Sequence, residues 1–268
     1  MTTLITKVGL PIVFSFMAVE LLVSWFLKDE TYDRGETRAN VMIGVVGTFL
    51  GRFVWSVLAF MVYEWAYGHA AHIFDMSLPS SWVALILFSD LAWYVEHRIG
   101  HEVRVMWAIH SVHHSSEKYN YSVALRLPWL GGLTRIPFLM LLAFAGFPPV
   151  AVFTGFSIVF LYQVWVHTQY VGKLGFLESI LNTPSHHRVH HASNAQYIDK
   201  NYGGIFIFWD KWFGTFEEEV EVPIYGITKP IHTSNPLKIN FIELAHMAQD
   251  VCEAPTIRAA AQRVVGRP

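Results

Sequence analysis

HRIGHEVRVMWAIHSVHH, residues 97–114, is the stretch that decides the fold, and SHHRVHH at residues 185–191 repeats its pattern. Within each cluster, histidines three or four residues apart share one face of an α-helix. Each predicted helix therefore offers several imidazoles to one small volume, which is the geometry of a metal site. Eight histidines of these clusters are candidate ligands: His97, His101, His110, His113, His114, His187, His190 and His191.

The type of donor narrows the choice of metal. Imidazole suits iron, copper, nickel and zinc, while the single cysteine, Cys252, excludes cysteine-rich zinc and iron–sulfur sites. The HRIGH motif also lacks the glutamate that follows the first histidine in the HExxH metalloproteases. We therefore expect a redox-active ion rather than a peptidase zinc.

The number of imidazoles predicts two ions. His167, near the end of the last apolar segment, would approach the same region and brings the candidate ligands to nine. Nine neutral imidazoles exceed the roughly four to six ligands of one ion, so two ions with open positions for oxygen are the natural division. His186 either joins them or points away. The remaining histidines are isolated and are excluded: His69, His72, His232 and His246.

Composition places the chain in a membrane. Of its 268 residues, 53% are hydrophobic and only 15% are charged, and the mean hydropathy is +0.35. A net charge of −2 provides no basic surface, so nucleic acid is excluded as a partner. One cysteine rules out a disulfide framework within the chain and fits a site that faces a reducing cytosol.

Long apolar segments predict an all-α integral membrane fold with about four to five transmembrane helices, since about 20 apolar residues cross the hydrocarbon core. The first segment is expected to be a retained anchor, because no small-residue cleavage pattern of a signal peptide follows it. Pro148 and Pro149 cannot continue a helix, so the last two segments should form a hairpin. The segments lie near residues 8–27, 41–67, 81–99, 128–147 and 149–170.

This topology places all three histidine clusters on one side of the membrane. The 68–80 loop has no Lys or Arg, whereas the cluster side carries many, so the positive-inside rule predicts a cytoplasmic site. Such a multi-pass protein would lie in the endoplasmic reticulum of a eukaryote or the inner membrane of a bacterium.

No linker or repeat divides the chain, and we expect one domain over residues 1–268. A cytosolic, histidine-rich helical cap, residues 97–127 and 171–268, should hold the two-metal site. Within it, the weakly amphipathic segment 237–263 could lie on the membrane or against the rest of the cap.

Two carboxylates near the first cluster are candidate catalytic residues. One helical stripe carries Asp90, Tyr94, His97 and His101. Asp90 would lie deeper in the membrane, where it could orient a ligand imidazole or be the structural partner of Arg52 or another buried polar group. Glu102 could accept a hydrogen bond from a ligand, handle a proton, or be a solvated surface residue.

Two further motifs receive structural interpretations. Gly47 and Gly51 form GxxxG in the second apolar segment, which indicates close helix packing. The aromatic stretch YGGIFIFW, residues 202–209, is expected to anchor the cap at the membrane interface, or alternatively to line an entrance for lipid.

The pattern HxxxH, HxxHH, HxxHH on a multispan chain resembles the fatty acid hydroxylase superfamily, which includes sterol desaturases and lipid hydroxylases with a non-haem di-iron centre. The resemblance covers roughly residues 85–245. It implies two iron ions held by the nine histidines, with Glu102 at the place of an acidic residue.

Within the superfamily, four segments are most similar to members that cleave the ether bond of alkylglycerols: HSVHHSSEKYNYSVALR, LNTPSHHRVHH, YIDKNYGGIFIFWDKWFGTF and YGITKPIHTSNP. Those enzymes hydroxylate the carbon beside the ether oxygen and use tetrahydrobiopterin as the reductant. The resemblance therefore implies an external reductant, with tetrahydrobiopterin as the candidate.

The leading hypothesis is an O2-dependent monooxygenase that hydroxylates a long-chain membrane lipid, with ether cleavage of alkylglycerols as the preferred reaction. The alternative is hydroxylation or desaturation of a sterol or fatty acyl chain. A membrane metal transporter is the alternative of another class, but transporters bind their ions near the bilayer midplane. No dinucleotide fingerprint or haem motif occurs, so a separate donor must supply electrons.

Overall fold

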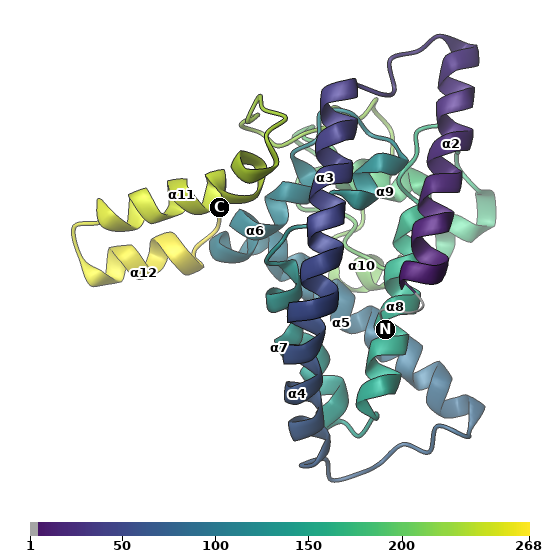
Figure 1. Cartoon of the computed structure of the whole chain (residues 1–268), viewed down its shortest axis with the longest axis vertical. Coiled ribbons are helices and arrows are strands. Elements are labelled where there is room, and N and C mark those ends of the chain that lie inside the picture. The colour runs from purple at the N-terminus through teal and green to yellow at the C-terminus, as the bar shows by residue number, and fades with distance from the viewer. Residues whose placement is uncertain (1–4) are drawn as a thin grey trace.

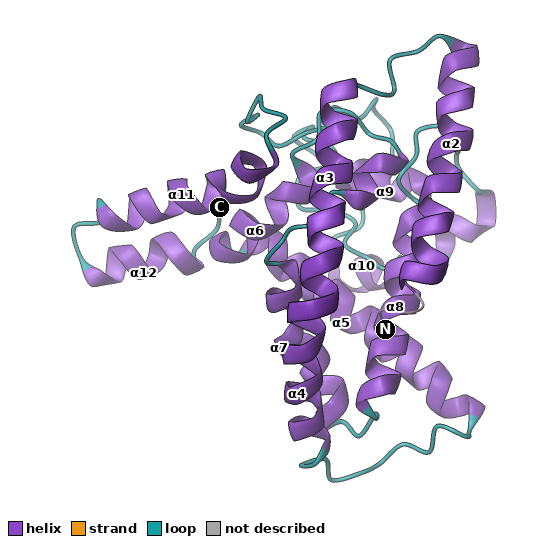
Figure 2. Ribbon diagram, in the orientation of Figure 1, coloured by secondary structure: helices purple, strands orange, loops and turns teal. Residues whose placement is uncertain are grey.

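The computed structural model describes residues 5–268, and this part of the chain is built from helices and loops (Figure 2). Two isolated bridges, Leu181 with Phe206 and Ala192 with Tyr225, are its only extended pairings. The helical fold predicted from the sequence is therefore confirmed for the described residues.

The N-terminal part consists of two long apolar helices (Figure 1). A π-turn, η1 (Ile5–Gly9), leads into α2 (Leu10–Leu27). Helix α3 (Arg34–Leu50), the π-turn η2 (Gly51–Trp55) and α4 (Ser56–Tyr67) then form one unbroken rod. The 34 residues of this rod span about 51 Å at 1.5 Å per residue, more than the thickness of a bilayer core.

Three further helices pack with α4 around the main hydrophobic core. They are α5 (Pro79–Glu102), α7 (Gly131–Phe144) and α8 (Pro149–Trp165). The core includes buried Tyr63, Leu85, Phe147 and Val152. As predicted, α7 and α8 form a hairpin with a tight turn at the two prolines. Helix α7 ends at Phe144, and α8 begins at Pro149.

Two segments, the one between α5 and α7 and the one after α8, form a cap of short helices and ordered loops. It contains α6 (Arg104–His114), η3 (Tyr121–Leu125), η4 (Gly175–Ser179), α9 (Pro184–His190) and α10 (Phe208–Phe213). The amphipathic segment becomes a hairpin of α11 (Pro236–Cys252) and α12 (Ile257–Val265). Both helices pack against α6, and the hairpin projects from the side of the molecule (Figure 1). Whether it also lies on the membrane surface stays a prediction.

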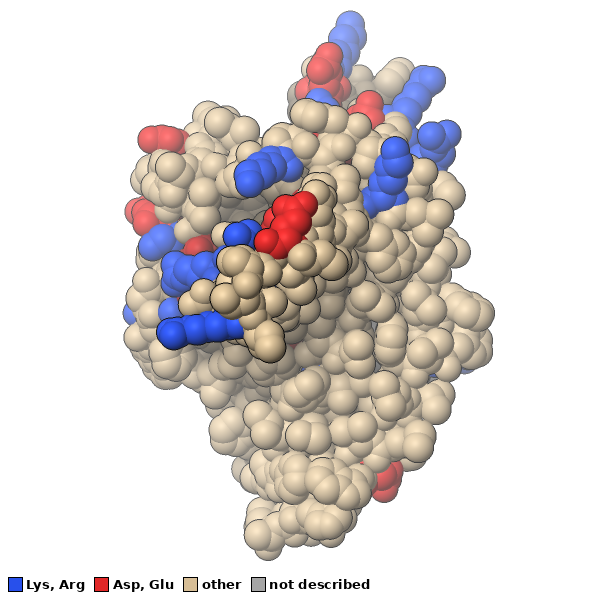
Figure 3. Space-filling view, turned by 90° about the vertical axis from the view of Figure 1, so that its left-hand side faces the viewer, with Lys and Arg blue, Asp and Glu red and all other residues tan. Residues whose placement is uncertain are grey.

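The outer surface indicates a membrane protein. Large apolar side chains are exposed along the long helices, among them Trp25 (70% exposed), Val45 (65%) and Met61 (65%). So much exposed apolar surface suits lipid rather than water. On the face in Figure 3, charged side chains gather on the upper half and leave the lower half almost bare.

The number of spans stays a prediction. Two helices, Lys7–Leu27 and Arg34–Tyr67, are long and apolar enough to cross a bilayer, whereas Gly131–Phe144 and Pro149–Trp165 are apolar but shorter. Helix α5 has 24 residues, but its inner face carries polar side chains such as Asp90 and Glu96, which lower its hydropathy.

The turn between α7 and α8 gives a test of the fold. Gly146 has a φ of +105°, and a Cβ there would lie 1.9 Å from the carbonyl oxygen of His72. We expect Gly146→Ala to destabilise the protein by at least about 2 kcal/mol, because both the backbone conformation and the contact become unfavourable. Thermal unfolding of the purified protein in detergent measures the change. Gly172→Ala, at a position with open space around it, is the control and should change little.

Candidate metal centre

Nine histidines from four elements converge beneath the cap, and they are the nine candidates chosen from the sequence. Helices α5, α6 and α9 supply seven of them, His191 follows directly as the C-cap of α9, and the turn after α8 supplies His167. Helix α5 remains helical through His101, as its role in presenting two ligands requires. The imidazoles form two groups, in each of which one nitrogen per ring lies within 4.8 Å of the others.

The two groups lie side by side. The five-histidine group contains His97, His101, His110, His114 and His190, and the four-histidine group contains His113, His167, His187 and His191. The rings of His114 and His191, one from each group, stack with centroids 4.3 Å apart. This arrangement fits two ions held close together.

Backbone carbonyls fix the orientation of several rings. The Nδ1 atoms of His97 and His190 lie 2.9 Å from the carbonyl oxygens of Tyr202 and Lys200. Since a carbonyl only accepts hydrogen bonds, each Nδ1 must carry the proton, and each Nε2 presents a lone pair. Both Nε2 atoms are buried and lack a hydrogen-bond partner among the described residues.

The four-histidine group shows most directly that the residues fit a cation. His113 and His167 also direct Nδ1 at carbonyl oxygens, those of Arg126 (3.3 Å) and Gln163 (2.6 Å). Their Nε2 atoms face each other at 3.2 Å, and neither has a proton to donate. Two nitrogens about 2.1 Å from one ion and at a right angle to each other lie about 3 Å apart. The spacing therefore suits two ligands of one metal ion.

The same spacing recurs in both groups. The Nε2 atoms of His187 and His167 are 3.2 Å apart. In the five-histidine group, the Nε2 atom of His114 lies 3.2 Å from that of His101 and 3.1 Å from that of His110.

Burial keeps these imidazoles neutral. It lowers the pKa values of the cap histidines well below the usual 6.5, and the mutual repulsion of their positive forms lowers them further. The histidines affected are His110, His113, His114, His187, His190 and His191. Neutral imidazole is the form that binds metal, so the site is ready for ligation at neutral pH.

Asp90 supports the site by holding a backbone loop in place, and it forms no hydrogen bond with a candidate ligand histidine among the described residues. Its buried carboxylate accepts hydrogen bonds from the backbone N–H of Phe206 (3.1 Å) and the indole of Trp209 (2.9 Å). It therefore holds the loop that carries Tyr202, whose carbonyl orients His97. Of the roles considered for Asp90, the structure matches partnership with buried polar groups, and these belong to the aromatic stretch rather than to Arg52.

The other end of this loop is held by residues that the sequence did not single out. Asp210 accepts hydrogen bonds from the N–H groups of Tyr202 (2.7 Å) and Gly203 (2.8 Å), and Asn182 donates to the Gly203 carbonyl (2.6 Å). A Cβ on Gly204 would lie 2.3 Å from the Asp90 carboxylate. The glycine pair thus lets the loop pass close to the two acids.

Arg126 performs a similar function for His113. Its side chain is 1% exposed and donates to the Val112 carbonyl (2.8 Å), to Ser115 (2.8 Å) and to Asn40 (2.8 Å). Burial lowers its pKa to about 10, so it stays charged at neutral pH. These bonds fix the backbone whose carbonyl faces His113.

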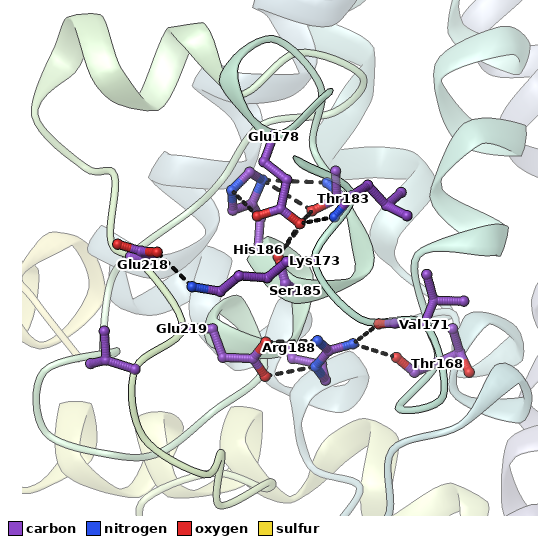
Figure 4. Close-up of polar contacts among 12 residues, drawn as sticks. Thr168, Val171, Lys173, Glu178, Thr183, Ser185, His186, Arg188, Glu218 and Glu219 are labelled. Carbon is purple, nitrogen blue, oxygen red and sulfur yellow. Dashed lines mark hydrogen bonds and ion pairs between the residues drawn. The ribbon is translucent and has the colours of Figure 1, made fainter. Parts of the chain in front are cut away.

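Arg188 ties α9 to the turn that bears His167 (Figure 4). It forms a two-pronged ion pair with Glu219, at 2.7 and 2.6 Å, and donates to the carbonyl oxygens of Thr168 (3.1 Å) and Val171 (2.7 Å). These bonds fix the position of the α9 histidines relative to His167.

His186 points away from both groups. Its ring faces Glu178, with Nε2 3.7 Å from the carboxylate, and it completes a capping box with Thr183 at the start of α9 (Figure 4). The open question about His186 thus has a structural answer: it caps its helix.

Glu102 does not contact a ligand imidazole at hydrogen-bond distance among the described residues. It pairs with Arg98 (3.0 Å), one turn earlier on α5. The carboxylate nearest to His101 is instead that of Asp199, 3.7 Å from Nδ1. A catalytic role for Glu102 stays a prediction.

Two hollows adjoin the histidine groups, and each is lined by different histidines. An inner cavity of about 40 Å³ meets members of both groups, including His110 and His113, and the rest of its lining is mostly apolar, with Arg135 and Gln163 as its polar members. A polar cleft of about 600 Å³ touches His101, His114, His190 and His191, and its outer wall includes Trp107 and Asp199. The site can therefore be approached separately by an apolar and by a polar molecule.

Comparisons with known proteins agree with this geometry. The family model for fatty acid hydroxylase matches residues 82–215. The chain is 42% identical to alkylglycerol monooxygenase of Homo sapiens over 89% of its length and 54% of that protein, and 36% identical to alkylglycerol monooxygenase of Danio rerio over 92% and 55%. Ornithine lipid hydroxylase OlsE of Rhizobium tropici is 26% identical over 56% and 46%.

The chain thus spans about half the length of the curated relatives that it matches. Among solved structures, the comparison found no significant match.

The division into two groups gives a prediction about metal content. Protein purified without oxygen should hold about two ions per chain. His190→Ala and His187→Ala, which remove one donor from each group, should each lower the content towards one. Metal analysis by mass spectrometry measures this, with exposed His246→Ala as the control. A full content in both variants would refute the assignment of ligands.

Acid should destabilise the metal-free protein. The unfolded chain takes up protons on its histidines near pH 6.5, but the buried rings resist protonation until the pH is much lower. As the pH falls below about 6.5, each such ring should remove up to about 1.4 kcal/mol of stability per pH unit. Thermal unfolding between pH 7.5 and 5.5 checks this. Replacing His110 and His114 by glutamine should make the dependence shallower, and an unchanged slope would contradict the explanation.

Proposed function

Because this chain belongs to the fatty acid hydroxylase family, we propose that it is an O2-dependent monooxygenase that hydroxylates a long-chain membrane lipid. The preferred substrate is an alkylglycerol, attacked at the carbon beside the ether oxygen. Relatives named alkylglycerol monooxygenase, 36% to 42% identical over most of this chain, support this choice.

One observation carries the proposal: two groups of inward-facing imidazoles lie between an apolar cavity and a polar cleft. A lipid C–H bond and a water-soluble reductant must both reach the centre of such an enzyme. The separate hollows supply the two routes.

The atoms and electrons of this reaction balance when one external reductant supplies two electrons. The lipid R–CH2–O–R′, O2, two electrons and two protons give the hemiacetal R–CH(OH)–O–R′ and water. The hemiacetal then loses the alcohol R′–OH as its C–O bond breaks and its hydroxyl proton is transferred, which leaves the aldehyde R–CHO.

We assign the histidines as ligands of two non-haem iron ions, which supply the activation of O2 when bound. The other residues of the site orient the imidazoles that would hold these ions. The carbonyl groups of Tyr202, Lys200 and Gln163 keep the protons on the outer ring nitrogens, so the inner nitrogens stay available. Asp199 faces His101 and would hold the proton on its Nδ1.

The electrons would come from a separate donor that binds in the polar cleft. Tetrahydrobiopterin, the reductant implied by the resemblance, is a small planar molecule that suits a cleft of this size. Trp107 stands at this wall with its ring 5.0 Å from that of His101, where it could stack on a planar reductant. We place the cleft on the cytoplasmic side of the membrane, since the cap is rich in basic residues.

The similarity to ornithine lipid hydroxylase favours a second candidate function, the hydroxylation of a membrane lipid other than an alkylglycerol, for which a fatty acyl chain is one target. The two functions share the metal centre and differ in the lipid. Product mass separates them: acyl hydroxylation adds one oxygen and keeps the lipid intact, whereas ether hydroxylation splits it. Desaturation would remove two hydrogens.

Turnover with ¹⁸O2 tests the proposed reaction. Iron-loaded protein given a hexadecyl glycerol, tetrahydrobiopterin and ¹⁸O2 should release hexadecanal that carries the label, once the aldehyde is trapped against exchange with water, and unlabelled glycerol. His113→Ala and His190→Ala should each reduce turnover at least about 100-fold. Exposed His246→Ala is the matched control. Full activity without iron, or an oxidised lipid with its ether bond intact, would refute the ether-cleaving reaction.

A further inference from the structure

The glycines of the GxxxG motif have different surroundings, although both were expected to permit helix packing. A Cβ on Gly47 would touch Leu127, with contacts of 3.2 Å to its carbonyl oxygen and 3.4 Å to its Cβ, so this residue does serve packing. A Cβ on Gly51 would meet nothing within 4 Å. Gly51 therefore faces open space, and helix packing does not explain it.

The open space at Gly51 is an apolar cavity, which we call the outer cavity. It has a volume of about 130 Å³ and lies between the rod α3–η2–α4 and helices α7 and α8. Its walls include Trp55, Tyr63, Phe153 and Phe156. Most of its lining is apolar, with polar side chains such as Arg52 and Arg135 among the remainder, so an apolar molecule suits most of its surface.

The rod is irregular where the outer cavity meets it. Gly51 begins the π-turn η2, which interrupts an otherwise regular helix. Glycine in a helix is unfavourable by about 1 kcal/mol relative to alanine, and π-turns in helices are frequent at functional sites. The rod thus departs from regular helix at the residue that leaves the cavity open.

The outer cavity adjoins the inner cavity at the metal centre. Leu127, Pro128, Arg135 and Phe160 line both. The two cavities therefore share a wall, and a chain in the outer cavity would end beside the space that the histidines face.

Arg135 stands at the junction of the two cavities. Its guanidinium lies over the rings of Trp93 (5.6 Å) and Phe156 (5.5 Å), and its buried Nε lies 3.9 Å from the Glu96 carboxylate, with no hydrogen bond among the described residues. The indole N–H of Trp93, a residue that is 9% exposed and lines the inner cavity, also lacks a partner. The unpaired indole N–H and the positive charge of Arg135, both beside the histidines, suit an oxygen atom of a lipid.

We propose that the outer cavity binds the hydrocarbon chain of the lipid substrate, with Gly51 keeping it open and Arg135 marking the start of the polar part of the lipid. This inference rests on the proposed function for the reaction at the lipid oxygen. The binding of the chain is a separate property and can be measured on its own.

A bulky residue at Gly51 tests the proposal. Gly51→Phe should fill the outer cavity, because its Cβ has room and its ring must enter the open space. Val57→Phe is the matched control: it adds a similar ring on the same rod at a residue that is 55% exposed and outside the cavity. Gly51→Leu is a smaller change in case the phenylalanine variant does not fold.

Binding is measured first, on metal-free protein. A hexadecyl glycerol brominated in mid-chain should quench the fluorescence of Trp55, isolated as the difference from a Trp55→Phe background. We expect this quenching in the natural protein and in Val57→Phe, and its loss in Gly51→Phe or its reduction in Gly51→Leu. Equal quenching in all folded variants would overturn the proposal.

Chain-length preference is measured second, on iron-loaded protein. Gly51→Phe should lower turnover of hexadecyl glycerol at least about 10-fold relative to octyl glycerol, with metal content unchanged and thermal stability unchanged or raised. An unaltered preference would count against the proposal. Chain-dependent quenching without any lipid oxidation would support the binding site while refuting the proposed reaction.

Discussion

The structure depends on one electrostatic constraint: lone pairs on neutral imidazoles converge in a buried space. The Nε2 atoms of His113 and His167 face each other at 3.2 Å, and carbonyl groups hold their protons on the opposite nitrogens. Such an arrangement is unfavourable unless positive charge lies between the rings. The surrounding protein must therefore be rigid enough to impose it.

That rigidity comes from buried polar groups which hold backbone in place. Asp90 and Asp210 bind the loop that carries Tyr202, Arg126 fixes the end of α6, and Arg188 joins α9 to the turn after α8. Each contributes several hydrogen bonds, so each is satisfied despite its burial. Remote parts of the chain thereby set the directions of the imidazoles, without any of these four side chains belonging to either histidine group.

The sequence predicted the helical fold, the α7–α8 hairpin and the nine histidines that converge, because these features depend on side-chain type and on local spacing. It did not predict how the histidines divide. Adjacent His113 and His114 point about 100° apart on α6 and fall in different groups, and which histidines join each of them depends on the packing of elements far apart in the sequence. Nor could it identify carbonyl partners such as those of Lys200 and Gln163, since every residue has a carbonyl. The polarity of α5 likewise shows why apolar length is a poor guide to the number of spans here.

The separate lining of the two hollows has a kinetic consequence under the proposed function. The apolar cavity and the polar cleft touch different edges of the histidine groups, so a molecule in one leaves the other free. Reductant and lipid would then occupy the enzyme together, in either order, as a ternary complex. Double-reciprocal plots, with the concentrations of lipid and reductant both varied, would give intersecting lines. Parallel lines would instead indicate that a product of one reactant leaves before the other reactant binds.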